Sequence, residues 1–168
     1  MTETRAALVI ASYRFDDERL TQLVAPAQDA IALSKVLENP DIGGFEVKTL
    51  INQPSHEVNR AIETFFSSRQ RDDLLLLYYS GHGIKDSEGR LYFATPDTLS
   101  GWPLTTAVPA TLVNDVMRRS RSRQQVLLLD CCFSGAFAKG MVAKAGEAIG
   151  STIGTKEQLG GRDRKAHV

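Results

Sequence analysis

Two short turns carry the side chains of this sequence that are best suited to covalent chemistry. One is Ser80-Gly81-His82-Gly83, where an imidazole lies between two glycines, and the other is Asp130-Cys131-Cys132, where a thiol follows a carboxylate. A thiol becomes a strong nucleophile when a neighbouring imidazole takes up its proton or stabilises the thiolate. If the two turns meet in the folded chain, His82 and Cys132 form a cysteine–histidine pair.

Each of these turns directly follows a run of apolar residues. Residues 74–79 and 125–129 are short and almost continuously apolar, which is the pattern of strands buried on both faces of a parallel sheet. Functional groups in an open parallel sheet gather at the carboxyl ends of the strands. We therefore expect His82 and Cys132 to lie at the same edge of one sheet.

The rest of the chain alternates between strand and helix patterns. Further strands are expected at residues 6–11 and 45–50, and a short hairpin or edge strand at residues 89–96. Helices are expected at residues 26–37, 55–66 and 110–120, because apolar residues recur there at helical spacing, and Ser55 is the expected N-cap of the second. This order predicts an α/β fold, with a mainly parallel central sheet between two helix layers.

The glycines beside His82 can help such a site to bind a substrate. Gly81 and Gly83 have no side chains, so the backbone of a substrate can approach them closely. We expect the backbone N–H groups of Gly83 and Cys132 to hold an oxyanion, since fixed donors of this kind stabilise the charge that develops in acyl transfer.

Simpler interpretations of the same residues remain open. A lone histidine is more often a surface or hydrogen-bonded core residue, and a lone cysteine is more often inert packing. Adjacent cysteines can form only a strained bridge, so Cys131 and Cys132 are expected to be thiols. Two cysteines and three scattered histidines lack zinc-site spacing, so no metal site is expected from them. Chemistry is favoured because both reactive residues end a buried strand in a glycine-bounded turn.

The two motifs together resemble those of a known group of peptidases. Residues 78–83 (YYSGHG) and 130–135 (DCCFSG) resemble the histidine and cysteine motifs of caspase-like cysteine peptidases, especially metacaspases and bacterial caspase-like proteins. Cys132 follows His82 by 50 positions, in agreement with caspase spacing. The resemblance covers residues 5–140 and implies a caspase-like three-layer sandwich, with Cys132 as nucleophile and His82 as its partner. Phe133 departs from it, because metacaspases often have His there.

The residue two places before the nucleophile bears on substrate preference. By resemblance to metacaspases, Asp130 lines an acidic pocket for Arg or Lys, Ser80 matches a second pocket position, and Asp29 looks like a third. Two carboxylates around a narrow pocket also suit a cationic side chain and repel an acidic one. Simpler roles remain open, Asp29 as a first-turn helix carboxylate and Asp130 as a strand-end cap. The resemblance thus implies hydrolysis of protein or peptide substrates after Arg or Lys.

Composition and charge argue against several other partners. Twenty basic residues balance twenty acidic ones, so no general field attracts nucleic acid or an anionic membrane. The arginine-rich residues 118–123 are expected to be a solvated helix end. No apolar run is long enough to span a membrane and the start of the chain lacks a signal-peptide layout, which favours the cytoplasm. No cofactor is expected; calcium, which many metacaspases bind, would have only Asp86, Glu88 and Asp97 here.

Residues 1–139 are expected to form one catalytic domain that resembles the large subunit of caspases. Residues 140–168 are rich in glycine and lack a strand pattern, so we expect a flexible linker or truncated tail. By the same resemblance, a smaller C-terminal segment would add strands and part of the substrate cleft. Candidate self-processing positions in the tail are the basic residues Lys156, Arg162, Arg164 and Lys165.

Two other functions remain as alternatives. A catalytically silent caspase-fold module could serve signalling or act as a scaffold, although an intact cysteine–histidine pair argues against it. A flavodoxin-like phosphate or nucleotide binder could use the glycine-bounded turns, but the chain has no Walker-type turn and no dinucleotide fingerprint. Alkylation by a peptidyl chloromethyl ketone that ends in Arg separates the three.

Overall fold

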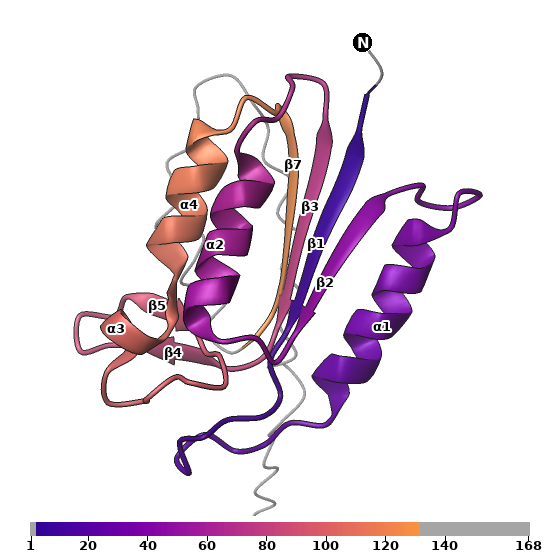
Figure 1. Cartoon of the computed structure of the whole chain (residues 1–168). Coiled ribbons are helices and arrows are strands. Elements are labelled where there is room, and N and C mark those ends of the chain that lie inside the picture. Colours follow the sequence, from indigo (N-terminus) through magenta and orange to yellow (C-terminus); the bar gives the residue numbers. More distant parts are fainter. Residues whose placement is uncertain (1–2, 132–168) are drawn as a thin grey trace, which may run out of the picture.

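The computed structural model describes residues 3–131, and within them the central element is a four-stranded sheet (Figure 1). Its strands are β1 (Arg5–Ala11), β2 (Glu46–Ile51), β3 (Leu74–Ser80) and β7 (Gln124–Asp130), in the order β2-β1-β3-β7. Every neighbouring pair is parallel. The predicted parallel sheet is confirmed, and each strand predicted for it forms within a residue or two of the expected bounds.

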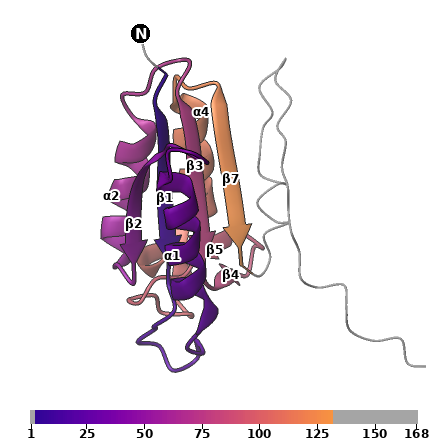
Figure 2. The ribbon, with the colours of Figure 1, turned by 90° about the vertical axis from the view of Figure 1, so that its right-hand side faces the viewer.

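Helices cover both faces of this sheet, as predicted (Figures 1 and 2). The helices α2 (Ser55–Phe66) and α4 (Ala110–Arg119) pack on one face, and α1 (Ala25–Glu38) packs on the other. Side chains alternate along a strand, so residues 6, 8 and 10 of β1 pack with α2 and α4, while residues 7, 9 and 11 pack with α1. The core is therefore two apolar layers, one on each side of β1 and β3.

A small antiparallel sheet follows the carboxyl end of β3. In the described part of the chain it consists of β4 (Gly83–Lys85), β5 (Leu91–Phe93) and β6 (Val108–Pro109), in that order. The sequence indicated only the middle strand, because runs of two or three residues are too short to show a period. A one-turn helix, α3 (Pro103–Thr106), precedes β6 and was likewise not predicted.

The start of α2 corrects one prediction. Pro54 is the N-cap residue, and Ser55 is the first residue of the helix. Both the amide and the hydroxyl of Ser55 donate to the carboxylate of Asp97, each at 2.8 Å. Partial burial raises the pKa of Asp97, but the hydrogen bonds from Thr95 and Ser55 outweigh it and leave the pKa below its usual value. Asp97 therefore caps α2 from a distant segment, which no local pattern reveals.

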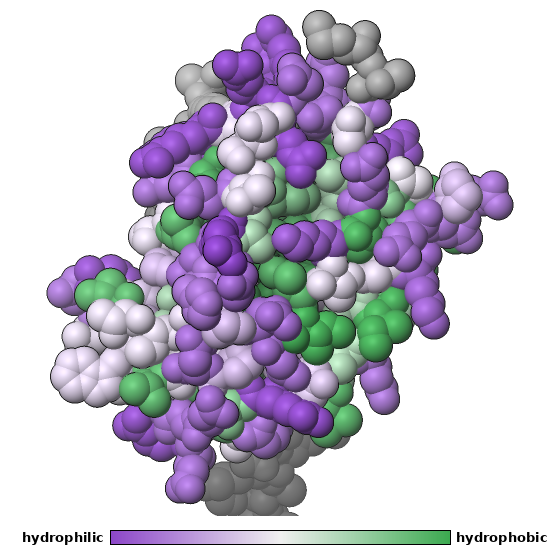
Figure 3. All heavy atoms as spheres, in the orientation of Figure 1, coloured by the Kyte–Doolittle hydropathy of each residue, from purple (hydrophilic) through white to green (hydrophobic). Residues whose placement is uncertain are grey.

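Hydrophilic side chains cover most of the outer surface of α2 and α4, and hydrophobic side chains show between α2 and α1, over β2 (Figure 3). Leu50 and Ile51 of β2 are half-buried, and α1 leaves Ile31 and Val36 exposed. In residues 3–131, no helix combines the length and the apolar character needed to cross a membrane.

Candidate active site

Strands β3 and β7 bring the ends of the two sequence motifs together. The strands are parallel neighbours, and their register sets Ser80 opposite Asp130. The Ser80 hydroxyl donates to Oδ2 of Asp130 at 3.5 Å, and the Gly81 amide donates to the Asp130 carbonyl at 3.3 Å. His82 and Cys132 each stand two residues beyond this matched pair in the sequence. Cys132 lies outside the described residues, so its pairing with His82 stays a prediction.

The His82 ring is held by a segment that sequence analysis did not single out, the β1–α1 loop (residues 12–24). Its Nε2 atom lies 2.8 Å from the carbonyl oxygen of Thr21. A carbonyl oxygen only accepts, so Nε2 carries a proton, and Nδ1 is the unprotonated nitrogen of the neutral ring. The Phe15 ring packs against the imidazole, with the ring centroids 4.9 Å apart. This loop therefore sets both the tautomer and the orientation of His82.

The β1–α1 loop is itself tied to the scaffold by side chains that bond its backbone. The Gln22 side chain exchanges two hydrogen bonds with the backbone of Phe15, at 2.9 and 2.8 Å. Asn52, in the left-handed region at φ 49°, accepts from the amides of Tyr13 and Arg14. An open pocket of about 470 Å³ lies on this loop, lined by Tyr13, Arg14, Phe15, Asp16, Gln22 and Leu23. Phe15, which lines this pocket, also packs against the ring of His82.

Tyr79 supports the backbone of His82 from inside the core. Its ring is buried, and its hydroxyl oxygen lies 3.0 Å from the carbonyl oxygen of His82 and 2.7 Å from that of Ala94. Burial raises the pKa of Tyr79 well above its usual value, so the hydroxyl stays protonated and donates. A Cβ added at Gly81 would lie 2.5 Å from the same hydroxyl oxygen. Packing against Tyr79 is therefore enough to require Gly81, which sequence analysis assigned to substrate approach.

The backbone N–H of Gly83 is directed away from β5. Gly83 lies opposite Phe93, and the Ala94 amide donates to the His82 carbonyl, so Gly83 and Phe93 form a non-hydrogen-bonded pair of the antiparallel ladder. In such a pair the peptide groups point away from the partner strand. The Gly83 N–H is therefore not used by the ladder between β4 and β5, which a donor to an oxyanion also requires. The second expected donor, the N–H of Cys132, is outside the described residues.

The three residues expected to bind a basic side chain all influence the pKa of Tyr78. Burial raises the pKa of Tyr78, a hydrogen bond with Ser80 lowers it, and the charges of Asp130 and Asp29 raise it further. Tyr78 packs on the α1 side of the sheet, Ser80 is buried, and both carboxylates are exposed. The structure therefore joins Ser80 to Asp130 by a hydrogen bond, and the charges of Asp29 and Asp130 both reach Tyr78, a residue that its apolar run concealed.

One alternative role of these carboxylates is wrong. The helix α1 begins at Ala25, so Asp29 is its fifth residue and lies outside the first turn, where the helix dipole favours a negative charge. Asp130 is the last residue of β7, and its backbone carbonyl accepts from the Gly81 amide. Its side chain extends toward Ser80.

Cys131 packs on the opposite side of the sheet from Asp130. Its half-buried thiol contacts the core layer formed with α2 and α4, on the same side as Tyr79. Side chains alternate along a strand, so neighbouring residues at the end of β7 serve different faces. Packing therefore accounts for Cys131.

The acidic residues considered for calcium are engaged by other groups. Asp86 accepts from the backbone and the side chain of Arg90 and from the hydroxyl of Tyr92. Partial burial raises the pKa of Asp86, but these hydrogen bonds outweigh it and lower the pKa to about 2. Glu88 pairs with the same guanidinium at 3.3 Å, and Asp97 caps α2. Within the described range, no three His, Cys, Asp or Glu side chains group as a metal site.

Comparison with known families bears directly on the two motifs. The family model described as the caspase domain matches residues 4–167. This chain belongs to the caspase domain family. The matched range includes both the histidine motif at residues 78–83 and the cysteine motif at residues 130–135. The predicted membership of the caspase-like cysteine peptidases is thereby confirmed, as is the caspase-like fold.

Two individual proteins are similar to this caspase-domain chain. The human mucosa-associated lymphoid tissue lymphoma translocation protein 1 is 24% identical over 132 residues, which are 79% of this chain and 15% of the human protein. The crystal structure of a protein from Geobacter sulfurreducens has a TM-score of 0.61 and 18% sequence identity, over 77% of this chain and 50% of that one. At this identity the structural likeness shows the fold alone. This chain spans half or less of either protein.

Proposed function

We propose that this chain is the catalytic segment of a cysteine endopeptidase that cleaves peptide bonds after Arg or Lys. The observation that carries the proposal is the register of β3 and β7, because Ser80 and its opposite residue Asp130 each stand two places before one member of the proposed catalytic pair. Membership of the caspase domain family, a family of peptidases, supports the same chemistry.

In the proposed reaction, the thiol proton of Cys132 passes to Nδ1 of His82, and Sγ attacks the carbonyl carbon of the scissile bond. The contact between Thr21 and Nε2 supports this role of Nδ1, because it leaves that nitrogen as the base. The N–H groups of Gly83 and Cys132 hold the oxyanion. The imidazolium then gives its proton to the leaving amine. Water hydrolyses the thioester, which releases the acid and restores the thiol.

The proposed preference for a basic residue rests on Asp29, Ser80 and Asp130. The two carboxylates influence the same Tyr78 hydroxyl, which supports a shared pocket. A guanidinium can bond two carboxylates through its fork of N–H donors, and an ammonium group can bond them as a compact charge. An acidic side chain of a substrate would meet two like charges there.

Labelling with an active-site-directed inhibitor tests the proposal. A peptidyl chloromethyl ketone that ends in Arg should alkylate Cys132, and mass spectrometry of the digested protein locates the adduct. The Cys131→Ala variant should label at the wild-type rate, whereas Cys132→Ala should not label. The same inhibitor ending in Asp should react much more slowly. A folded protein that does not label would instead favour a catalytically silent caspase-fold module in signalling or as a scaffold.

A further inference from the structure

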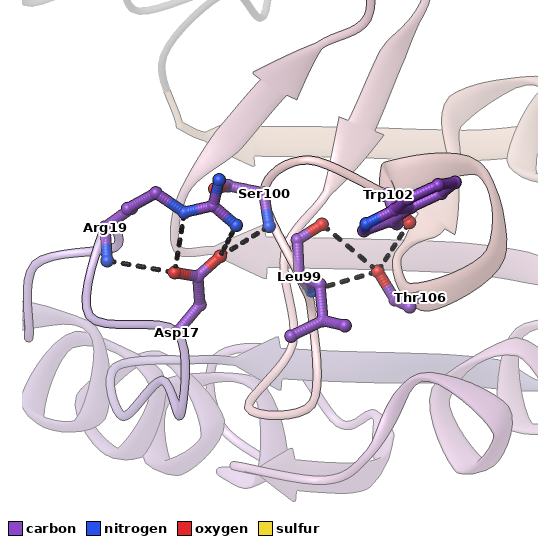
Figure 4. Close-up of polar contacts among 6 residues, drawn as sticks. All are labelled: Asp17, Arg19, Leu99, Ser100, Trp102 and Thr106. Atoms are coloured by element: carbon purple, nitrogen blue, oxygen red, sulfur yellow. Dashed lines mark hydrogen bonds and ion pairs between the residues drawn. The ribbon is translucent and has the colours of Figure 1, made fainter.

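A buried carboxylate of the β1–α1 loop lies outside the proposed catalytic groups. The Asp17 side chain is 7% exposed. Its Oδ1 atom accepts from the amide and from Nε of Arg19, both at 3.0 Å, and Oδ2 accepts from Nη2 of Arg19 at 3.0 Å and from the Ser100 amide at 2.6 Å (Figure 4). These bonds from the Arg19 side chain and the two amides hold the pKa of Asp17 well below its usual range. Asp17 is thus an ionised carboxylate that accepts four hydrogen bonds.

The bond from Ser100 to Asp17 joins two segments that are 83 residues apart in the sequence. The second segment has hydrogen bonds of its own. The Thr106 hydroxyl lies 3.0 Å from the Leu99 amide, which donates to it, and 2.7 Å from the Trp102 carbonyl, which accepts from it (Figure 4). Asp17 therefore connects the β1–α1 loop to residues 99–106, a segment that hydrogen bonds of its own hold in place.

The same loop presents the carbonyl group that holds His82. Thr21 stands four residues after Asp17, and the turn between them is closed by the Leu20 amide, which donates to the Asp17 carbonyl at 2.9 Å. The Leu20 side chain is buried. One short turn thus connects the anchor at Ser100 with the Thr21 oxygen at the imidazole.

We infer that Asp17 is a positioning residue for His82, because it fastens the loop whose Thr21 carbonyl holds Nε2 of the imidazole. The catalytic meaning of this inference rests on the proposed function. An Asn at position 17 has a single acceptor oxygen and no charge for the Arg19 guanidinium. The substitution therefore weakens the contacts through which Asp17 holds the loop. The Nε2-protonated tautomer of His82 then loses the carbonyl that favours it.

The test compares Asp17→Asn with Asp73→Asn as a matched control. Asp73 is also buried and also accepts from two backbone amides, those of Thr4 and Gln70, but it lies before β3 at the other end of the strand from His82. Nitrogen-15 NMR of histidine-labelled protein reports the tautomer of each neutral ring. The chain has three histidines, so a His82→Asn variant assigns the signal.

Wild type and Asp73→Asn should show His82 with its proton on Nε2, and Asp17→Asn should show a mixture of tautomers. With an Arg-ending peptide substrate, Asp17→Asn should lower kcat about tenfold or more and change KM by about twofold or less, since it disturbs proton transfer rather than the basic pocket. An unchanged tautomer in folded Asp17→Asn overturns the inference. Inactive wild type overturns the proposed function instead and leaves the tautomer comparison intact.

A second variant covers the case in which Asp17→Asn does not fold. Arg19→Gln keeps the carboxylate and its bond from Ser100 but removes the guanidinium that supplies two of the four donors. We expect a smaller shift of the His82 tautomer in the same direction. If Arg19→Gln is folded and its tautomer matches wild type, the inference is wrong.

Discussion

At the scale of single residues, the alternation of side chains at the ends of β3 and β7 separates packing from chemistry. Tyr79 and Cys131 point into the core layer with α2 and α4, whereas Ser80 and Asp130 meet on the other side. The same alternation predicts that Cys132 leaves the core layer that holds Cys131. The position of Cys131 in the core is why the two thiols are expected to behave differently.

Cys132→Ala should abolish peptide hydrolysis, and Cys131→Ala should retain most of it. The second substitution removes a half-buried sulfur from the core, so it should lower the free energy of unfolding by about 1 kcal/mol. Steady-state hydrolysis of an Arg-ending peptide and urea unfolding measure the two effects. Comparable loss of activity in both folded variants would contradict the assignment of the nucleophile.

Asp130→Asn should weaken hydrolysis after basic residues. Removing one carboxylate partner of a cation in a complex typically costs about 2–5 kcal/mol, and the exposure of Asp130 favours the low end, so kcat/KM should fall about thirtyfold. Asp29→Asn gives the matched comparison for the second carboxylate. Cleavage of a peptide library preferentially after Asp would overturn the proposed pocket.

At the scale of elements, long periodic segments could be predicted from the sequence, and segments defined by distant contacts could not. The strand at residues 74–80 is visible because its apolar run is continuous, but β6 has two residues and no period. Ser55 has the residue type of an N-cap, yet its partner Asp97 is 42 residues away. The residues of the proposed pocket could be named because their side-chain types suggest a role, but Thr21 acts through its backbone carbonyl, and every residue type has one.

The cap that Asp97 places on α2 should be measurable. Asp97→Ala removes the acceptor for the Ser55 amide and hydroxyl, and loss of an N-terminal cap typically costs about 1 kcal/mol. Asp115→Ala is the control, because that carboxylate is exposed on α4 and pairs only across one turn with Arg118, a pair worth about 0.5 kcal/mol or less. Equal urea midpoints for the two variants would show that Asp97 does not cap the helix.

At the scale of the whole molecule, the pKa values of three hydrogen-bonded carboxylates predict how the free energy of unfolding changes as the pH falls. The pKa values of Asp17, Asp86 and Asp97 are all lowered in the folded chain. Between the ordinary value of 3.8 and the lowered values, the unfolded chain binds more protons than the folded one. Their stabilising contribution is therefore fully present above about pH 4 and is lost progressively as the pH falls through the lowered pKa values.

The Asp86→Asn variant tests this dependence. Burial opposes ionisation of Asp86, but the hydrogen bonds of Arg90 and Tyr92 outweigh it and set its pKa at about 2. The variant should be less stable than wild type at pH 7, and the gap between their unfolding free energies should narrow from pH 5 to pH 2. Urea unfolding at several pH values measures the gap. Parallel curves would show that this carboxylate does not contribute to acid unfolding.

The contact between His82 and a main-chain oxygen has a consequence for mutational tolerance. Replacing Thr21 with Ala or Val keeps the carbonyl, so turnover should stay near the wild-type level, whereas replacing Asp17 releases the turn that aims that carbonyl. A scan of all substitutions across residues 12–24 should therefore find position 17 far less permissive than position 21. Position 21 would then vary between sequences, even though the carbonyl oxygen of that residue makes the contact with His82.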